Sequence, residues 1–249
     1  IFSMIFNLQS ILQSILNQIK LDSCLDFAQI LLNPNLTHMI NGIDFIKVSI
    51  NCRDFIEVSM SKQTSPTSSS SMSSGNKSAV YLFLTSDSVF SSLIQALDQV
   101  LSNSTSFNKE KYLEILKSTN YISVTSNSCI SYYYVIYVGQ TDNMERRLDQ
   151  FKRCLEASKE SCGHTFAEKL KILFQQSKSL NSLDLYVLVF YISVSIPNAN
   201  VSNNSFPTEL LKSLSNEFIR KALEECFIEK WRPIFNFIKK GKTDKTLKI

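Results

Sequence analysis

Three segments of the chain are continuously apolar and aromatic, a pattern typical of strands buried on both faces. They are SAVYLFLT, SYYYVIYVG and LDLYVLVFYISVS, at residues 78–85, 131–139 and 183–195. β-branched and aromatic residues favour strands over helices. We therefore expect these segments to form the strands of one small sheet.

Segments with helical periodicity lie between and after these strands. After the second strand, Asp142 or Asn143 can cap a helix whose apolar stripe recurs at i, i+4, i+7 and i+11, formed by Met144, Leu148, Phe151 and Leu155. Further helices are expected at residues 89–101, 165–176 and 208–231, and Pro233 stops the last. This order predicts an α+β fold, a small three-stranded antiparallel sheet flanked by helices.

The first part of the chain has a different pattern. Residues 1–19 are apolar at helical spacing, residues 24–32 form a second apolar run, and the similar segments 44–50 and 54–60 predict a hairpin. The Ser-rich stretch 63–78 predicts a flexible linker. The sequence thus predicts a mainly helical N-terminal extension (1–62), the linker (63–78), a main domain with an insertion (79–238, insertion 86–129) and a basic tail (239–249).

Composition narrows the class of protein. The 44% apolar and 11% aromatic content is typical of a folded globular chain, and a net charge of +4 does not by itself indicate a nucleic-acid binder. Six cysteines without a repeated CxxC pattern favour an intracellular, reducing setting over a disulfide framework. The Cys154, Cys162 and His164 cluster lacks a fourth ligand at finger-like spacing, so we expect no zinc site there. The amphipathic first helix is unlike a signal peptide or a membrane span.

A short motif covers the end of the second strand and the start of the helix that follows it. Tyr137-Val138-Gly139 ends that strand, and Arg147 follows Tyr137 by ten residues on the next helix. This arrangement resembles the second half of the GIY-YIG motif of the GIY-YIG endonuclease family, in particular of the incision domain of bacterial excision-repair nucleases. Ala79-Val80-Tyr81 on the first strand is the best candidate for the first half, with Ala in place of the usual Gly.

The end of the domain is similar to the same family. Residues 223–236 resemble the family helix that carries a metal-binding Glu and then an Arg-Pro-x-aromatic-Asn terminus, which assigns these roles to Glu224 and Asn236. The resemblance implies a GIY-YIG-like fold and a DNA endonuclease that uses Mg²⁺ or Mn²⁺ bound by Glu224, in the nucleus rather than the cytoplasm. It implies the catalytic residues Tyr81, Tyr137, Arg147, Glu224 and Asn236. Together with the charge of the tail, it predicts the nucleic-acid-binding residues Gly139, Gln140, Thr141, Asn143, Arg146, Lys239, Lys240 and Lys242.

These residue types suit phosphodiester hydrolysis. A hard cation takes carboxylate and water oxygens, so Glu224 is the expected metal ligand. The planar fork of Arg147 fits a phosphate bidentately. A phenol from Tyr81 or Tyr137 can orient the attacking water or, with a lowered pKa, accept its proton.

Other interpretations stay open. Taken singly, Arg147 fits a solvated helix face, Glu224 fits an i, i+4 ion pair with Arg220, and tyrosines in aromatic strands fit a core. Phe151 stands where the family often has His or Tyr, and Phe cannot donate a hydrogen bond. The alternative function is therefore an inactive nucleic-acid-binding or scaffold module of the same fold. A third possibility is that residues 1–62 act as an interaction domain carried by the rest.

Overall fold

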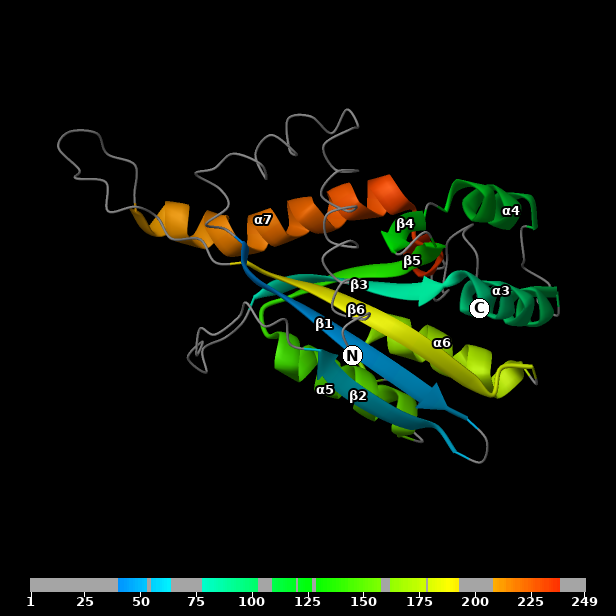
Figure 1. Cartoon of the computed structure of the whole chain (residues 1–249). Helices are drawn as coiled ribbons and strands as arrows, with labels where there is room; N and C mark the ends of the chain where they lie inside the picture. The colour runs from blue at the N-terminus through cyan, green and yellow to red at the C-terminus, as the bar shows by residue number, and fades with distance from the viewer. Residues whose placement is uncertain are drawn as a thin grey trace.

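The described part of the chain is built on one six-stranded antiparallel sheet, in the order β2-β1-β6-β3-β5-β4 (Figure 1). The structure is a computed structural model that describes residues 40–52, 55–63, 78–102, 109–119, 121–126, 129–157, 162–177, 179–192 and 208–237. The strands are β1 (Ile40–Asn51), β2 (Glu57–Gln63), β3 (Ala79–Ser86), β4 (Tyr121–Ser126), β5 (Cys129–Thr141) and β6 (Ser182–Ile192).

Helices cover both faces of the sheet. They are α3 (Asp87–Ser102), α4 (Lys109–Ser118), α5 (Met144–Glu156), α6 (Thr165–Gln176), α7 (Thr208–Trp231) and α8 (Ile234–Phe237). The helices expected after the first strand, at residues 89–101, after Asn143, 165–176 and 208–231, are present within a few residues of the sequence-based bounds. No helix among the described residues combines the length and apolarity needed to span a membrane.

The expected three-stranded sheet is wrong, although the α+β character holds. The hairpin β1–β2 belongs to the same sheet, because β1 pairs with β6 from Ile40↔Ile192 to Asn51↔Ser182. Strand β4, from the expected insertion, pairs with β5 and widens the other edge. Strand β6 is apolar on both faces, and β1 completes its hydrogen bonding on the side away from β3. The helix expected at residues 1–19, the centre of the linker and the basic tail lie outside the described residues.

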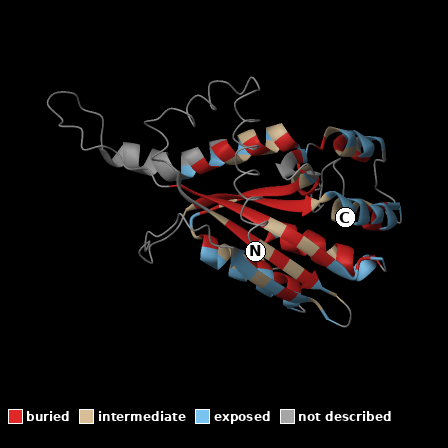
Figure 2. Cartoon of the chain, viewed as in Figure 1, coloured by how far each residue is buried: buried red, intermediate tan, exposed pale blue. Residues whose placement is uncertain are grey.

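Strand β3 is buried on both faces, as its unbroken apolar pattern predicted (Figure 2). Val80, Leu82 and Leu84 share one core with residues of α7, which are Leu223, Phe227 and Trp231. Tyr81 and Phe83 point to the opposite face and share a second core with α3, α5, α6 and α8. Successive residues of one strand therefore connect the two helical layers.

Gly139 allows β5 to pass directly beneath the ring of Tyr81. The two residues lie opposite each other in the β3–β5 ladder. A Cβ on Gly139 would lie 2.6 Å from Cζ and from the hydroxyl of Tyr81, and 2.9 Å from Cε1 of Tyr137. Carbon atoms do not approach so closely, so the glycine of the YVG tripeptide is required here by space.

We expect Gly139→Ala to destabilise the protein by about 1–3 kcal/mol, the usual cost of overpacking a core. Alanine in a strand otherwise stabilises relative to glycine, so a loss identifies the clash. The measurement is the free energy of unfolding in urea. In a Tyr81→Ala background the same substitution should cost clearly less, because only the contact with Tyr137 remains. An unchanged cost in that background would contradict this packing account.

Candidate active site

Arg147 is the centre of the site. Helix α5 begins after Asn143, whose side-chain oxygen accepts from the backbone N of Arg146 at 2.9 Å, as the sequence predicted for one of two caps. This start places Arg147 in the second turn of α5, over β3. Its Nε donates to the Tyr81 hydroxyl at 3.0 Å. One hydrogen bond thus joins two of the expected site residues, which are far apart in the sequence.

The other hydrogen bonds of Arg147 also go to neutral oxygens. Its Nη1 donates to Gln150 Oε1 at 2.9 Å and to the Gly163 carbonyl at 3.1 Å. Arg147 forms no ion pair with any described residue. Burial acts to lower the pKa of Arg147, but the oxygens of Tyr81 and Tyr137 raise it above its ordinary value overall. The half-buried guanidinium therefore stays charged without a carboxylate partner.

Tyr81 and Tyr137 lie side by side, with ring centroids 6.3 Å apart. Tyr81 is fully buried, whereas Tyr137 keeps 8% of its surface exposed. Burial raises the pKa of Tyr81, and burial together with the neighbouring Tyr81 raises that of Tyr137. Both phenols therefore hold their protons near neutral pH. Of the two roles left open by the sequence, a raised pKa suits orientation of a water better than acceptance of its proton.

Glu224 is a half-buried carboxylate on α7 that makes no hydrogen bond or ion pair with any described residue. Burial raises its pKa, Glu225 adds to this, and Arg147 and Lys221 oppose it. The charge of Glu224 in turn acts on Tyr81, on Tyr137 and on Arg147, although no hydrogen bond or ion pair joins it to them. A carboxylate without a partner in this position fits a hard divalent cation.

Asn236 contacts the strand backbone rather than the cleft. Its Nδ2 donates to the Val138 carbonyl at 2.8 Å, and its Oδ1 accepts from the Val138 N at 2.8 Å. The β4 ladder on this edge of β5 ends at Tyr134, so the Asn236 amide replaces a missing neighbouring strand at Val138. Asn236 thus fixes the position of β5 between Tyr137 and Gly139.

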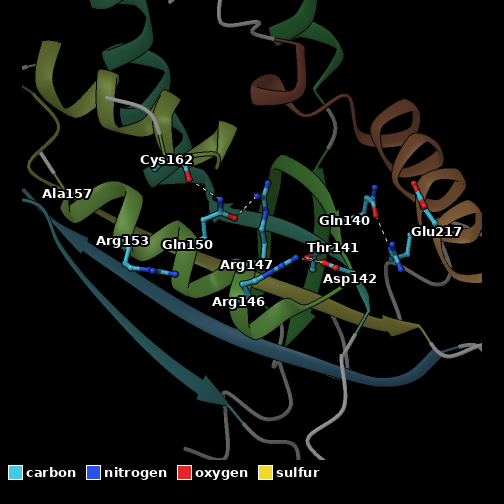
Figure 3. A pocket seen from close by; sticks show the side chains of 11 residues that line it. Gln140, Thr141, Asp142, Arg146, Arg147, Gln150, Arg153, Ala157, Cys162 and Glu217 are labelled. Carbon is cyan, nitrogen blue, oxygen red and sulfur yellow. Dashed lines mark hydrogen bonds and ion pairs between the residues drawn. The ribbon is translucent and has the colours of Figure 1, made fainter. Parts of the chain in front are cut away.

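A cleft of about 1010 Å³ opens between α5 and α7 at the end of β5 (Figure 3). Of the expected nucleic-acid-binding residues, Gln140, Thr141 and Arg146 line it. The complete lining is Gln140, Thr141, Asp142, Arg146, Arg147, Gln150, Arg153, Ala157, Cys162, Glu217 and Arg220. Gly139 lies under the Tyr81 ring and Asn143 caps α5. Lys239, Lys240 and Lys242 are outside the described residues.

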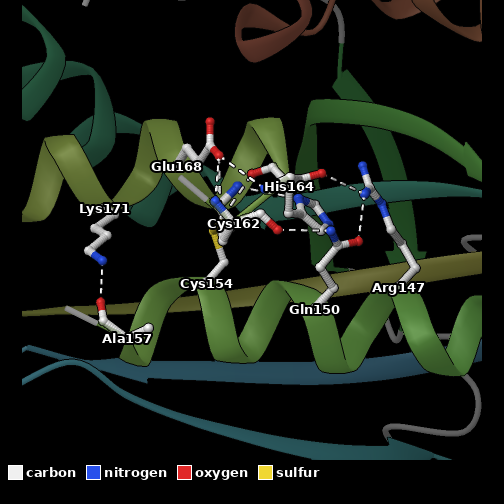
Figure 4. Close-up of a disulfide and its surroundings, with 10 residues drawn as sticks. Arg147, Gln150, Cys154, Ala157, Cys162, His164, Glu168 and Lys171 are labelled. Carbon is white, nitrogen blue, oxygen red and sulfur yellow. Dashed lines mark hydrogen bonds between the residues drawn. A yellow bond between two sulfur atoms is a disulfide. The ribbon is translucent and has the colours of Figure 1, made fainter. Parts of the chain in front are cut away.

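A disulfide between Cys154 and Cys162 joins α5 to the segment before α6 (Figure 4). The Cys162 carbonyl accepts from Gln150, and the next carbonyl, that of Gly163, accepts from Arg147. The disulfide therefore fixes the segment whose two carbonyls accept hydrogen bonds from Gln150 and Arg147. Sequence reasoning did not predict this pair, because cysteine spacing alone does not give connectivity. Sulfurs bonded to each other are not thiolate ligands for a metal.

Two residues that the sequence singled out lie in the core beside Arg147. Phe151 is fully buried, with its ring centroid 4.9 Å from that of Phe83. His164 is also buried, and its Nδ1 accepts from the Ala167 N as the cap of α6. Burial, together with the charge of Arg147, lowers the pKa of His164 to about 3. His164 is therefore neutral at physiological pH.

Comparison of the chain with protein-family models, curated proteins and solved structures found no match. The functional conclusion therefore depends on the geometry of the site and on the motif resemblance alone.

Proposed function

We propose that this protein is a divalent-metal-dependent endonuclease of the GIY-YIG type that hydrolyses DNA phosphodiester bonds. The observation that carries the proposal is the convergence of Arg147, a half-buried guanidinium without a carboxylate, and Glu224, a half-buried carboxylate without a cation. Buried charges in proteins are normally paired. A phosphate on Arg147 and a metal ion on Glu224 supply both missing partners.

Each residue then has a distinct role. Arg147 binds phosphate oxygens and stabilises the charge that grows on them during hydrolysis. Tyr81 accepts the Nε hydrogen bond and so fixes the direction of the guanidinium. Tyr137, the more exposed phenol, orients the attacking water with its O–H. Glu224 would hold Mg²⁺ or Mn²⁺, and a bound ion would supply a water of lowered pKa and stabilise the charge on the leaving oxygen.

A second candidate function is nucleic-acid binding without cleavage. The observations that favour it are the complete burial of Tyr81 and the raised pKa of both phenols, which leave no evident proton acceptor beside Arg147. Phe151 also lies in the core and donates no hydrogen bond to the cleft. The two functions differ in one measurable property, which is metal-dependent strand cleavage.

Wild-type protein should convert supercoiled plasmid DNA to the nicked form in Mg²⁺ or Mn²⁺ and not in EDTA. Glu224→Gln keeps the side-chain size but removes the charge, so nicking should fall by on the order of 100-fold or more, whereas DNA binding survives. Glu225→Gln is the matched control, because Glu225 is adjacent but exposed. Equal nicking by the Glu224→Gln variant removes Glu224 from the site, and DNA binding without nicking by the wild type favours the second function.

The raised pKa of Glu224 predicts a pH-dependent change in stability of the metal-free protein. A carboxyl group with a raised folded-state pKa favours folding when protonated, and this contribution is lost as pH rises through that pKa. Ionised Glu224 thus costs stability at neutral pH. Glu224→Gln should raise the melting temperature at pH 7 and leave it unchanged well below the ordinary glutamate pKa of 4.5.

The measurement is thermal melting of the metal-free wild type and variant across this pH range, with Glu225→Gln as the control. A lower melting temperature for Glu224→Gln at pH 7 would mean that the carboxylate has a stabilising partner, and it would contradict the account of an uncompensated charge.

A further inference from the structure

A second arginine in the cleft, Arg220 on α7, has only 8% of its surface exposed. Its Nε donates to Gln140 Oε1 at 2.9 Å, and its Nη1 donates to Ser78 Oγ at 2.9 Å. Gln140 is near the end of β5 and Ser78 immediately precedes β3. Three separate segments of the chain therefore fix this guanidinium at the end of the sheet.

Arg220 forms no ion pair with any described residue, and the carboxylate on which its charge acts, Glu217, is paired with a lysine. Both of its hydrogen-bond acceptors are neutral, and Nη2 donates to no described residue. Glu217, three residues earlier, pairs with Lys221 at 2.7 Å. Glu224, four residues later, makes no ion pair with it. Burying a cation without a counter-ion costs free energy, so arginines are rarely buried unless paired.

Two other arginines that line the cleft, Arg146 and Arg153, do have carboxylate partners. Arg146 pairs with Asp142 at 2.8 Å and Arg153 pairs with Asp149 at 2.6 Å, and all four side chains are more than half exposed. Such i, i+4 pairs are ordinary features of a solvated helix face and contribute little free energy. Arg147 is half-buried and Arg220 is buried, and both are held by neutral oxygens without an ion-paired carboxylate. They lie on helices that pack on opposite faces of the sheet.

We infer that Arg220, held by Gln140 and Ser78, is a second phosphate-binding position for a neighbouring phosphodiester of the same nucleic-acid strand. This inference rests on the proposed function. The planar guanidinium presents parallel N–H donors that match a phosphate, and a ligand in the cleft supplies the missing anion. Glu224 lies one turn from Arg220 on the same face of α7. A strand bound by Arg147 and Arg220 crosses the cleft from α5 to α7, beside the proposed metal ligand.

The test measures binding of a short fluorescein-labelled DNA duplex by anisotropy in EDTA, over a series of salt concentrations, so that cleavage does not interfere. Arg220→Met should raise the dissociation constant about tenfold and flatten the slope of log K against log salt by roughly 0.9. Lys117→Met is the control, because it removes one exposed charge from α4, outside the cleft. It should leave both quantities at the wild-type values.

Gln140→Glu separates phosphate binding from a structural role of Arg220. This isosteric change replaces the Gln140 amide, which accepts from Arg220, with a carboxylate. The fold is therefore retained, while the positive charge of Arg220 that would attract a phosphate is neutralised. DNA affinity and the salt slope should fall at least as far as in Arg220→Met, with an unchanged or higher melting temperature. Wild-type affinity and slope in Gln140→Glu would overturn the inference and leave Arg220 as a link between α7 and the sheet.

The same experiment distinguishes failure of the inference from failure of the proposed function. A wild type that nicks plasmid DNA in Mg²⁺, with Arg220→Met and Gln140→Glu binding as tightly as Lys117→Met, overturns the Arg220 position alone. A wild type that neither binds the duplex nor nicks the plasmid overturns the proposed function and this inference with it.

Discussion

The hydrogen bond from Arg147 to Tyr81 is the interaction on which the candidate site depends. It joins the Arg147 guanidinium on α5 to the Tyr81 hydroxyl on the central strand β3. The bond forms only because Gly139, opposite Tyr81, leaves room for the ring. The carbonyl of Gly163, held by the Cys154–Cys162 disulfide, fixes the second side of the guanidinium. The space that Gly139 leaves for the Tyr81 ring thus determines where the Arg147 guanidinium is held in the cleft.

The site is also defined by charges that have no partner in the described chain. The buried Arg220, the half-buried Arg147 and the half-buried Glu224 form no ion pair with one another, although the charge of Arg147 acts on Glu224. Arg147 bonds to a phenol, an amide and a carbonyl, and Arg220 to an amide and a hydroxyl. Such a region stores electrostatic free energy that an anionic ligand and a cation would recover together. This is why we favour phosphate chemistry over a structural network.

Local patterns gave β3, β5, β6 and the helices α3, α5, α6 and α7 correctly, but not α4 and β4 within the expected insertion. Partners over long sequence separations could not be predicted. The continuous apolar run of β3 and the periodic stripe of α5 are visible in short windows. The spacing of Gly139 and Arg147 is equally local. Pairing of β1 with β6 joins residues more than a hundred positions apart and depends on which edge the folded sheet leaves open, so the sheet appeared smaller than it is. The sequence suggested Arg220 only as an i, i+4 ion-pair partner of Glu224, and its contacts with Gln140 and Ser78 were not predicted.

The central claim is that Glu224 and Arg147 bind a metal ion and a phosphate at one site. A crystal of the full chain with a short DNA duplex and Mn²⁺, measured for anomalous scattering, tests it most directly. The account predicts one Mn²⁺ peak within about 2.2 Å of a Glu224 oxygen, with a DNA phosphate in hydrogen-bond contact with the Arg147 guanidinium. A Mn²⁺ peak only beside Glu168 near the disulfide, or DNA bound away from Arg147, would contradict it.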